Sequence, residues 1–294
     1  MRDLTGASPA AISAERASIP REGIGAAILN CQEPDGSWRH AGEPAWLSTL
    51  FTLQLLRATG IDPAEPVVES AMTRLADGLR WNDQDGFWEL RSVESGGNTF
   101  FEGEVEPCIN SGALAIGSCF GHPAESLAQR LMGEQLSDGG WNCEAPKSVR
   151  SSFHTTICVL EGLLQFERAV GSAPEIIACR RRGEEYLLQR ALFRRFSTGE
   201  VADAAFLKFA FPPRYHYDVL RALNYLRDSG VEYEARFEEA LRGVQSRRQA
   251  DGRWLLDDSH DEGLAVPAGE VVGEPSRWNT LRALRVLRWY EGQG

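Results

Sequence analysis

Asp35-Gly36-Ser37-Trp38 is a turn that this chain repeats, as Asp85-Gly86-Phe87-Trp88, Asp138-Gly139-Gly140-Trp141 and Asp251-Gly252-Arg253-Trp254. The first three copies start about 50 residues apart, and the last follows after roughly twice that distance. Self-similarity at such a period is typical of an array of identical supersecondary units. We therefore expect a repeat protein that has lost one copy of the turn between the third and the fourth.

Each copy of the turn lies between two stretches whose apolar residues recur with helical spacing. The stretches before the turns include Glu22–Asn30, Val67–Leu79, Ala124–Gln135 and Tyr233–Arg248, and those after them begin near Pro44, Pro107, Ser152, Arg214 and Ser276. Proline and serine suit the first turn of a helix. The sequence therefore predicts an all-α fold of about five helical hairpins. The missing turn is placed at Ser197-Thr198-Gly199, after an amphipathic run from Glu184 to Phe196.

Composition narrows the class of protein. The 294 residues carry a net charge of −11 and no run of Lys or Arg, which argues against a nucleic-acid partner. No stretch of about 18 apolar residues and no secretory signal is present, so we expect no membrane span and a cytoplasmic location. The six cysteines are scattered, which favours free thiols. We expect one domain over residues 1–294, with residues 1–20 as a loosely ordered arm.

The second helices of the hairpins align on a column of leucines. Six residues before these leucines, the alignment gives Leu47, Cys108, His154, Tyr217 and Trp278, and the next column gives Ser48, Ile109, Thr155, Asp218 and Asn279. Polar and aromatic groups therefore gather at the first turn of helices that are otherwise mostly apolar. This pattern predicts a cavity with a polar mouth above apolar walls.

The repeated pattern Gln-x-x-Asp-Gly-x-Trp, as in Gln32 to Trp38, resembles the QW repeat of squalene–hopene cyclases and its relative in protein prenyltransferase β subunits. The resemblance spans nearly the whole chain. It implies an α/α toroid with an inner and an outer ring of helices. The likeness to the prenyltransferases would also allow a partner subunit.

Two local motifs are similar to the zinc site of the prenyltransferase β subunits. Glu106-Pro107-Cys108 resembles their Asp-x-Cys, and Gly139-Gly140-Trp141 followed by Phe153-His154-Thr155 resembles their Gly-Gly-Leu with an aromatic-His-Thr. The resemblance implies Glu106, Cys108 and His154 as Zn²⁺ ligands. The column alignment supports the pair Cys108 and His154 independently, because neighbouring helices pack 8–10 Å apart. The alternative is that both are packing residues, and Cys143 is either a fourth ligand or a loop cysteine with no function.

Other candidate residues lie at the same end of the second helices. His216, Tyr217 and Asp218 are candidates for proton transfer, and the candidates for substrate binding are Trp46, Arg214, Trp278 and Asn279. Capping and packing are the alternative roles for all of them. The acidic stretch Asp257–Asp261, which includes His260, reads as a solvated loop.

Three functions follow from these observations. The first is a zinc-dependent enzyme acting on an apolar or isoprenoid-like small molecule, with alkyl or prenyl transfer as one reaction. The second is a metal-free terpenoid cyclase, and the third is a binding protein without catalysis. Two departures from the families matter: the Asp-x-Asp-Asp acid of the cyclases is missing, and Gly96–Val105 has no basic residue to hold a diphosphate.

Overall fold

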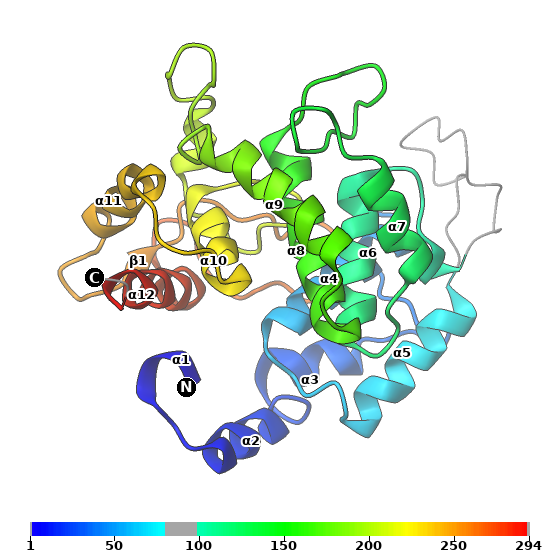
Figure 1. The fold of residues 1–294 in the computed structure, drawn as a ribbon. Helices are drawn as coiled ribbons and strands as arrows, with labels where there is room; N and C mark the ends of the chain where they lie inside the picture. The colour runs from blue at the N-terminus through cyan, green and yellow to red at the C-terminus, as the bar shows by residue number, and fades with distance from the viewer. Residues whose placement is uncertain (1, 80–98, 293–294) are drawn as a thin grey trace.

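The computed structural model describes residues 2–79 and 99–292 of the chain. The second copy of the turn, Asp85–Trp88, lies outside the described residues. The described residues are mostly helical, as the sequence predicts, and contain twelve α-helices (Figure 1). None of these helices is long and apolar enough to cross a membrane.

Ten of the helices form the predicted series of pairs. They are preceded by α1 (Arg2–Thr5) and α2 (Pro9–Ser18) and run as α3 (Gly23–Asn30), α4 (Ala45–Ala58), α5 (Pro66–Gly78), α6 (Pro107–Cys119), α7 (Glu125–Gly133), α8 (Phe153–Val170), α9 (Pro174–Leu188), α10 (Val219–Ser229), α11 (Glu238–Ser246) and α12 (Arg277–Glu291). Short 3₁₀ turns lie at η2 (Phe100–Glu102), η3 (Ala204–Leu207) and η4 (Ala235–Phe237), and the two-residue strands β1 (Trp254–Leu255) and β2 (Pro275–Ser276) pair antiparallel.

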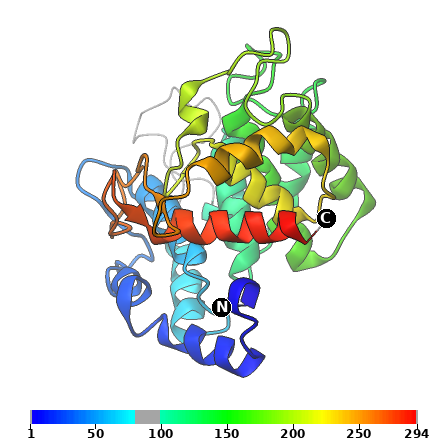
Figure 2. The same cartoon turned by 90° about the vertical axis from the view of Figure 1, so that its left-hand side faces the viewer.

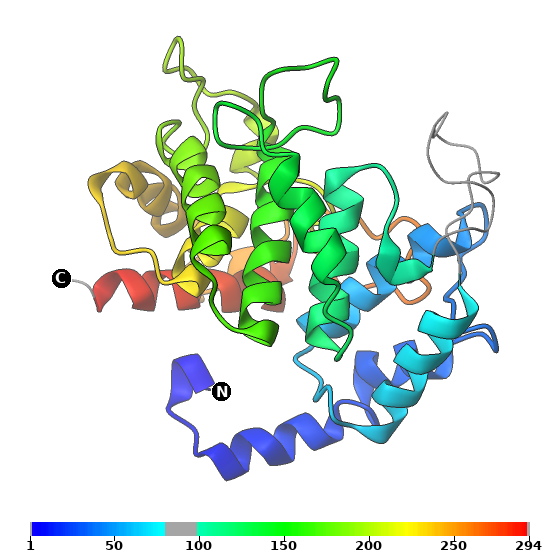
Figure 3. The same ribbon diagram turned by 45° about the vertical axis from the view of Figure 1, so that its right-hand side comes forward.

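The even-numbered helices from α4 onward form a connected series, called the inner helices below, in which α4 contacts α6, α6 contacts α8, α8 contacts α10 and α10 contacts α12. Odd-numbered helices flank them, so that α7 contacts α6 and α8, and α11 contacts α10 and α12 (Figures 1 and 3). Helices α6 and α8 pack most closely. A Cβ at Gly162 would lie 2.7 Å from the carbonyl oxygen of Ser111, so only glycine permits this approach.

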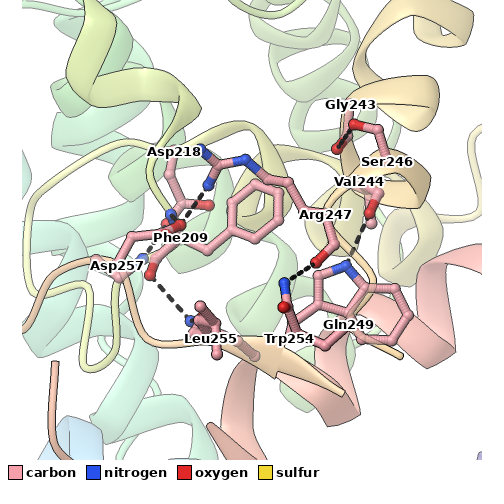
Figure 4. Close-up of polar contacts among 12 residues, drawn as sticks. Phe209, Asp218, Gly243, Val244, Ser246, Arg247, Gln249, Trp254, Leu255 and Asp257 are labelled. Atoms are coloured by element: carbon pink, nitrogen blue, oxygen red, sulfur yellow. Dashed lines mark hydrogen bonds and ion pairs between the residues drawn. The ribbon is translucent and has the colours of Figure 1, made fainter. Parts of the chain in front are cut away.

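The repeated turn has the same geometry in its three described copies. The indole N–H of Trp38, Trp141 and Trp254 donates to the carbonyl oxygen ten residues earlier, at 2.7 Å each time. The glycine of each turn has a positive φ, between 83° and 95°, which explains why this position is glycine. The turn therefore ties the ends of α3, α7 and α11 to a buried tryptophan; Figure 4 shows the bond from Trp254 to Val244.

A second bond joins the same tryptophans to the following helix. The backbone N–H of Trp38, Trp141 and Trp254 donates to a threonine hydroxyl at 2.9 to 3.1 Å, and these threonines are Thr49, Thr156 and Thr280. The three threonines occupy one column of the sequence alignment, next to that of Ser48 and Asn279. The alignment of α4, α8 and α12 is therefore confirmed.

The fourth hairpin departs from the prediction at both of its helices. Helix α9 ends at Leu188 and does not continue to Phe196, because Ala191 and Leu192 adopt positive φ values of 44° and 69°. Helix α10 begins at Val219, five residues after the expected start near Arg214, with Asp218 as its N-cap. Gly199 lies in an exposed loop closed by the bridge between Arg194 and Val201, where no tryptophan braces the chain.

The first residues contact the last helix. The carboxylate of Asp3 lies 2.8 Å from Arg285 and 3.1 Å from Arg227, and the carbonyl of Leu4 accepts a hydrogen bond from Arg288. Figure 2 shows α1 beside α12. Helix α2 buries no residue, whereas α1 is held in place by these ion pairs.

Candidate functional site

A cavity of about 510 Å³ lies where the inner helices α4, α6 and α8 begin. Its wall combines apolar and ionisable side chains, as the polar mouth predicted from the alignment requires. The residues that line it are Glu43, Pro44, Trp46, Leu47, Phe51, Glu104, Glu106, Cys108, Ile109, Cys143, Glu144, His154, Thr155, Arg214, Tyr215 and His216.

Three of these side chains form a cluster that could hold a metal ion. Ligand atoms of Glu106, Cys108 and Cys143 lie within 4.8 Å of one another, and all three residues are partly buried. Glu106 is the N-cap residue of α6 and Cys108 is in the first turn of that helix. Cys143 comes from the loop after the turn at Trp141. The cluster thus joins the start of one inner helix to the loop that leads to the next.

The two sulfur atoms are in direct contact. Cys108 Sγ lies 3.0 Å from Cys143 Sγ and 3.6 Å from Glu106 Oε2. The hydroxyl of Thr155 fixes the loop cysteine, because it accepts from the Cys143 N–H at 3.3 Å and donates to its sulfur at 3.4 Å. The contact with Cys143 raises the pKa of the Cys108 thiol, and the same contact lowers the pKa of Cys143. Cys143 is therefore the first of the pair to become a thiolate.

A buried carboxyl group, Glu104, lies beside the cluster. Its side chain accepts hydrogen bonds from the backbone N–H groups of Val105 and Glu106. Burial raises the pKa of Glu104 to about 7, despite these two hydrogen bonds, which favour the charged form. Burial also raises the pKa of Glu106 above its ordinary value. The wall of the cavity therefore carries two carboxyl groups that hold their protons more tightly than exposed ones.

His154 lines the cavity but lies outside the three-residue cluster. Its Nδ1 accepts the backbone N–H of Tyr217 at 2.9 Å. A neutral imidazole that accepts at Nδ1 carries its proton on Nε2. Burial and the charge of Arg221 lower the pKa of His154, which favours this neutral form. In this state the ring offers a hydrogen-bond donor and no free lone pair for a metal ion.

Two further histidines, His216 and His260, lie beside His154. The rings of His216 and His260 are stacked with centroids 3.7 Å apart, and the His154 ring is 5.8 Å from that of His216. Burial, with the nearby His260 and His154, lowers the pKa of His216 to about 4. The stretch Asp257–Asp261 was expected to be a solvated loop, and this expectation is wrong because all five residues are partly buried.

The histidines predict a loss of stability in acid. Below pH 6.5 an unfolded His216 takes up a proton, whereas the folded ring stays neutral down to about pH 4. The stabilising contribution is thus complete above pH 6.5 and is lost as the pH falls through that window. We expect the free energy of unfolding to drop by about 1 to 2 kcal/mol more between pH 7 and 4.5 in the native chain than in His216→Gln, measured by urea unfolding. The exposed His40, changed to Gln, should leave the pH dependence as it is, and equal slopes for both variants would contradict this assignment.

The other predicted proton-transfer residues do not line the cavity. Tyr217 is buried among Phe153 and Phe206, and its hydroxyl donates to the carbonyl of Leu192. Asp218 is buried and accepts the backbone N–H of Arg221 at 2.8 Å as the cap of α10. Of the three candidates, the structure places His216 alone on the cavity wall.

The predicted substrate-binding residues are divided between two places. Trp46 and Arg214 line the cavity. Trp278 is stacked on Phe211 with centroids 4.5 Å apart and does not reach the cavity wall. Asn279 is buried, and its amide donates to the carbonyls of Phe209 and Leu255.

Sequence reasoning missed Glu104, read His260 as part of a solvated loop, and left open whether Cys143 is a ligand or a loop cysteine with no function. A signal existed for Cys143, because it follows Trp141 by two residues and the turn brings that loop to the start of α8. Comparison with known proteins adds no further assignment. No protein-family profile matches this chain, and no curated protein matches it at a significant level.

Proposed function

We propose that Glu106, Cys108 and Cys143 bind Zn²⁺ and that the protein is a zinc-dependent enzyme acting on an apolar small molecule in the cavity of about 510 Å³. The observation that carries this proposal is the convergence of one carboxylate and two thiols within 4.8 Å on the wall of that cavity. Three protein ligands with one position left for substrate are typical of catalytic zinc sites.

The donor set fits zinc better than a harder ion. Two sulfur ligands select zinc over magnesium or calcium, which prefer oxygen. On a tetrahedral zinc with bonds of ~2.3 Å, two sulfurs lie about 3.7 Å apart. The present separation of 3.0 Å is smaller, so the two sulfurs would have to move apart by about 0.7 Å to bind the ion.

Other residues on the cavity wall would contact the substrate and transfer protons. Bound zinc would supply a Lewis acid that polarises a substrate oxygen or keeps a substrate thiol ionised. His154 lines the cavity and, in its neutral form, is held with its proton on Nε2 by the Tyr217 backbone. The neutral His216 can accept a proton at an imidazole nitrogen. Trp46, Phe51 and Ile109 provide apolar contact for the substrate.

The substrate class follows from the cavity walls and from the resemblance of the repeat. Aromatic and aliphatic side chains suit an isoprenoid-like molecule, and transfer of an alkyl or prenyl group to a thiol is the reaction that the zinc motif favours. The connected series α4–α6–α8–α10–α12 with flanking helices supports an α/α toroid as the arrangement that encloses the cavity.

Metal analysis tests this proposal. Protein purified without chelators should contain about one zinc per chain, and Cys108→Ser and Cys143→Ser should each lose most of it. Substitution with Co²⁺ should give a sulfur-to-cobalt charge-transfer band that weakens in either variant. Cys31→Ser, at an exposed free thiol, is the matched control and should keep the metal.

The same measurement separates Cys143 from His154 as a ligand. We expect His154→Gln to keep the zinc and to lose turnover, because its ring donates a hydrogen bond in this proposal. Zinc lost from His154→Gln but retained in Cys143→Ser would contradict our ligand assignment. If the purified protein contains no zinc and Cys108→Ser does not lower its activity, the protein is not a zinc-dependent enzyme.

A metal-free terpenoid cyclase is the second candidate. The observation that favours it is the group of aromatic rings on the cavity wall, Trp46, Phe51 and Tyr215, whose π faces can stabilise a carbocation. The carboxyl group of Glu104 lies on the same wall. This candidate predicts full activity in Cys143→Ser and loss of activity when Trp46 is changed to Leu.

A further inference from the structure

A second, smaller cavity lies deeper between the inner helices. Its volume is about 150 Å³, and α4, α6, α8, α10 and α12 all contribute to its wall. Phe51, Cys108 and Arg214 line both cavities, so the two adjoin. Of the three residues of the metal cluster, Cys108 lines the smaller cavity, whereas Glu106 and Cys143 do not.

Four arginines line this small space, and their charges are unevenly matched. Arg221 forms two hydrogen bonds to the carboxylate of Glu161, at 2.9 and 2.7 Å. Arg214 lies 3.6 Å from an oxygen of Glu262. The guanidinium of Arg282 donates to the carbonyl of Ala210 at 2.6 Å and to Oδ1 of Asn279, and the fourth arginine is Arg57. Glu161 is the one carboxylate on the described part of the cavity wall, so positive charge exceeds negative charge there.

Several polar atoms on this wall lack a partner. Within residues 2–79 and 99–292, the buried Nε atoms of Arg57, Arg214 and Arg282 and the buried Oδ1 of Asn224 have no hydrogen-bond partner. Arg57 has no hydrogen bond or ion pair through its guanidinium in that part of the chain. A buried donor without an acceptor is costly, and a buried charge without a partner is costlier.

A purely structural role for Arg57 does not explain this arrangement. A structural buried arginine in the same molecule is Arg180, whose guanidinium contacts the carboxylates of Glu167 and Glu184 and the hydroxyl of Tyr225. Arg57 has no such set. Its guanidinium lies near enough to Glu161 to lower the pKa of that carboxyl, but Glu161 already has both oxygens bonded to Arg221.

We propose that the small cavity binds the oxyanion end of a ligand, a carboxylate or a phosphate group, with Arg57 and Arg282 as its main donors. Guanidinium groups bind such oxyanions with paired hydrogen bonds. A volume of about 150 Å³ is several times the room that one water needs. An apolar remainder of the ligand would extend past Cys108 into the larger cavity. The binding of the anion does not depend on the proposed zinc.

Thermal unfolding with simple anions tests the proposal. Sodium phosphate and sodium acetate are compared with sodium chloride at equal ionic strength, with the native chain and with Arg57→Gln. At an anion concentration 100-fold above Kd, we expect the melting temperature of the native chain to rise by about 5 °C. In Arg57→Gln this rise should fall by about half or more, and a titration followed by calorimetry should show affinity reduced at least ~10-fold.

The controls separate a bound anion from general effects. Phosphate stabilises many proteins by exclusion from their surface, and this effect should be equal in both chains. Without anion, Arg57→Gln should be at least as stable as the native chain, because it removes a buried Nε–H donor that has no acceptor. Arg57→Lys keeps the charge and should recover part of the affinity, whereas Arg242→Gln, at an exposed ion pair, should bind like the native chain. Chelator treatment should leave the response intact even if the zinc proposal fails.

Ligands with the same alkyl chain show whether the cavity prefers a carboxylate or a phosphate group. Octanoate and octyl phosphate are compared with octanol, which lacks the charge. We expect octanoate to bind roughly 10-fold more tightly than acetate, or octyl phosphate roughly 10-fold more tightly than phosphate, since the alkyl chain reaches the larger cavity. No binding of phosphate, acetate or either amphiphile to the native chain, or an equal response in Arg57→Gln, would overturn the proposal.

Discussion

Replacing Trp141 with alanine should lower the free energy of unfolding by about 3 to 5 kcal/mol. The indole is fully buried, and its ring lies so close to α9 that a Cβ at Gly183 would be 2.8 Å from it. It also donates to the carbonyl of Leu131 at 2.7 Å. The substitution removes a large apolar volume and leaves a buried carbonyl without its donor. Denaturant unfolding followed by circular dichroism measures the change.

Two matched substitutions show which part of the effect belongs to the repeated turn. Trp141→Phe keeps most of the buried ring and loses the hydrogen bond, so we expect a cost of about 1 to 2 kcal/mol. Trp289→Ala, at a partly exposed tryptophan of α12 outside the turn, should cost much less than Trp141→Ala. Similar losses for Trp141 and Trp289 would contradict the bracing role of the turn.

Replacing Arg180 with methionine should lower the free energy of unfolding by a similar amount, about 3 to 5 kcal/mol. Arg180 on α9 contacts Glu167 on α8 at 2.6 Å and Glu184 at 2.9 Å, and its side chain is 7% exposed. The hydroxyl of Tyr225 on α10 donates to Glu184 at 2.7 Å. Removing the arginine leaves two carboxylates close together with no cation between them, and three helices lose their common contact.

A combined variant tests this explanation. In Arg180→Met with Glu167→Gln and Glu184→Gln the charges are gone, and we expect at least half of the lost stability to return at pH 7. Arg236→Met, at an exposed pair with Glu185, should cost less than about 1 kcal/mol. If the triple variant is as unstable as the single one, the loss comes from packing and not from unpaired charge.

The sequence predicted those parts of the fold that depend on local signals. Serine at the N-cap fixed the starts of α8 and α12, and the side chains of Ser152 and Ser276 do accept the expected backbone N–H groups. The turn glycines showed where the chain reverses after α3, α7 and α11. These features rest on residues within a few positions of one another, so the sequence displays them directly.

The end of α9 could not be predicted in this way. Ala191 and Leu192 have no intrinsic preference for positive φ, and they adopt it because Leu192 is fully buried and its carbonyl accepts the hydroxyl of Tyr217. Tertiary contact therefore overrides the helical periodicity of the run to Phe196. The late start of α10 has the same origin, because Asp218 caps it while the preceding residues line the cavities.

The candidate site shows a similar division. Cys108 was found because it lies at a helix start, where the repeats can be aligned, and Glu106 was found from the resemblance of Glu106-Pro107-Cys108 to the Asp-x-Cys motif. Cys143 and His260 lie in loops of different lengths, and no alignment of helices brings them into register with the cavity. Glu104 is an ordinary glutamate in sequence, and only its burial makes it unusual.

The tryptophan of each described turn has one further consequence, for the way the molecule can open. Its indole holds the helix before it, and its backbone N–H holds the threonine of the helix after it. A fluctuation that frees one helix must therefore break a bond that supports the other, so the smallest region that can unfold on its own is a whole hairpin. The hairpin of α9 and α10 has no such tryptophan in its connection, and its two helices are joined instead by the hydrogen bonds of Tyr225 with Arg180 and Glu184.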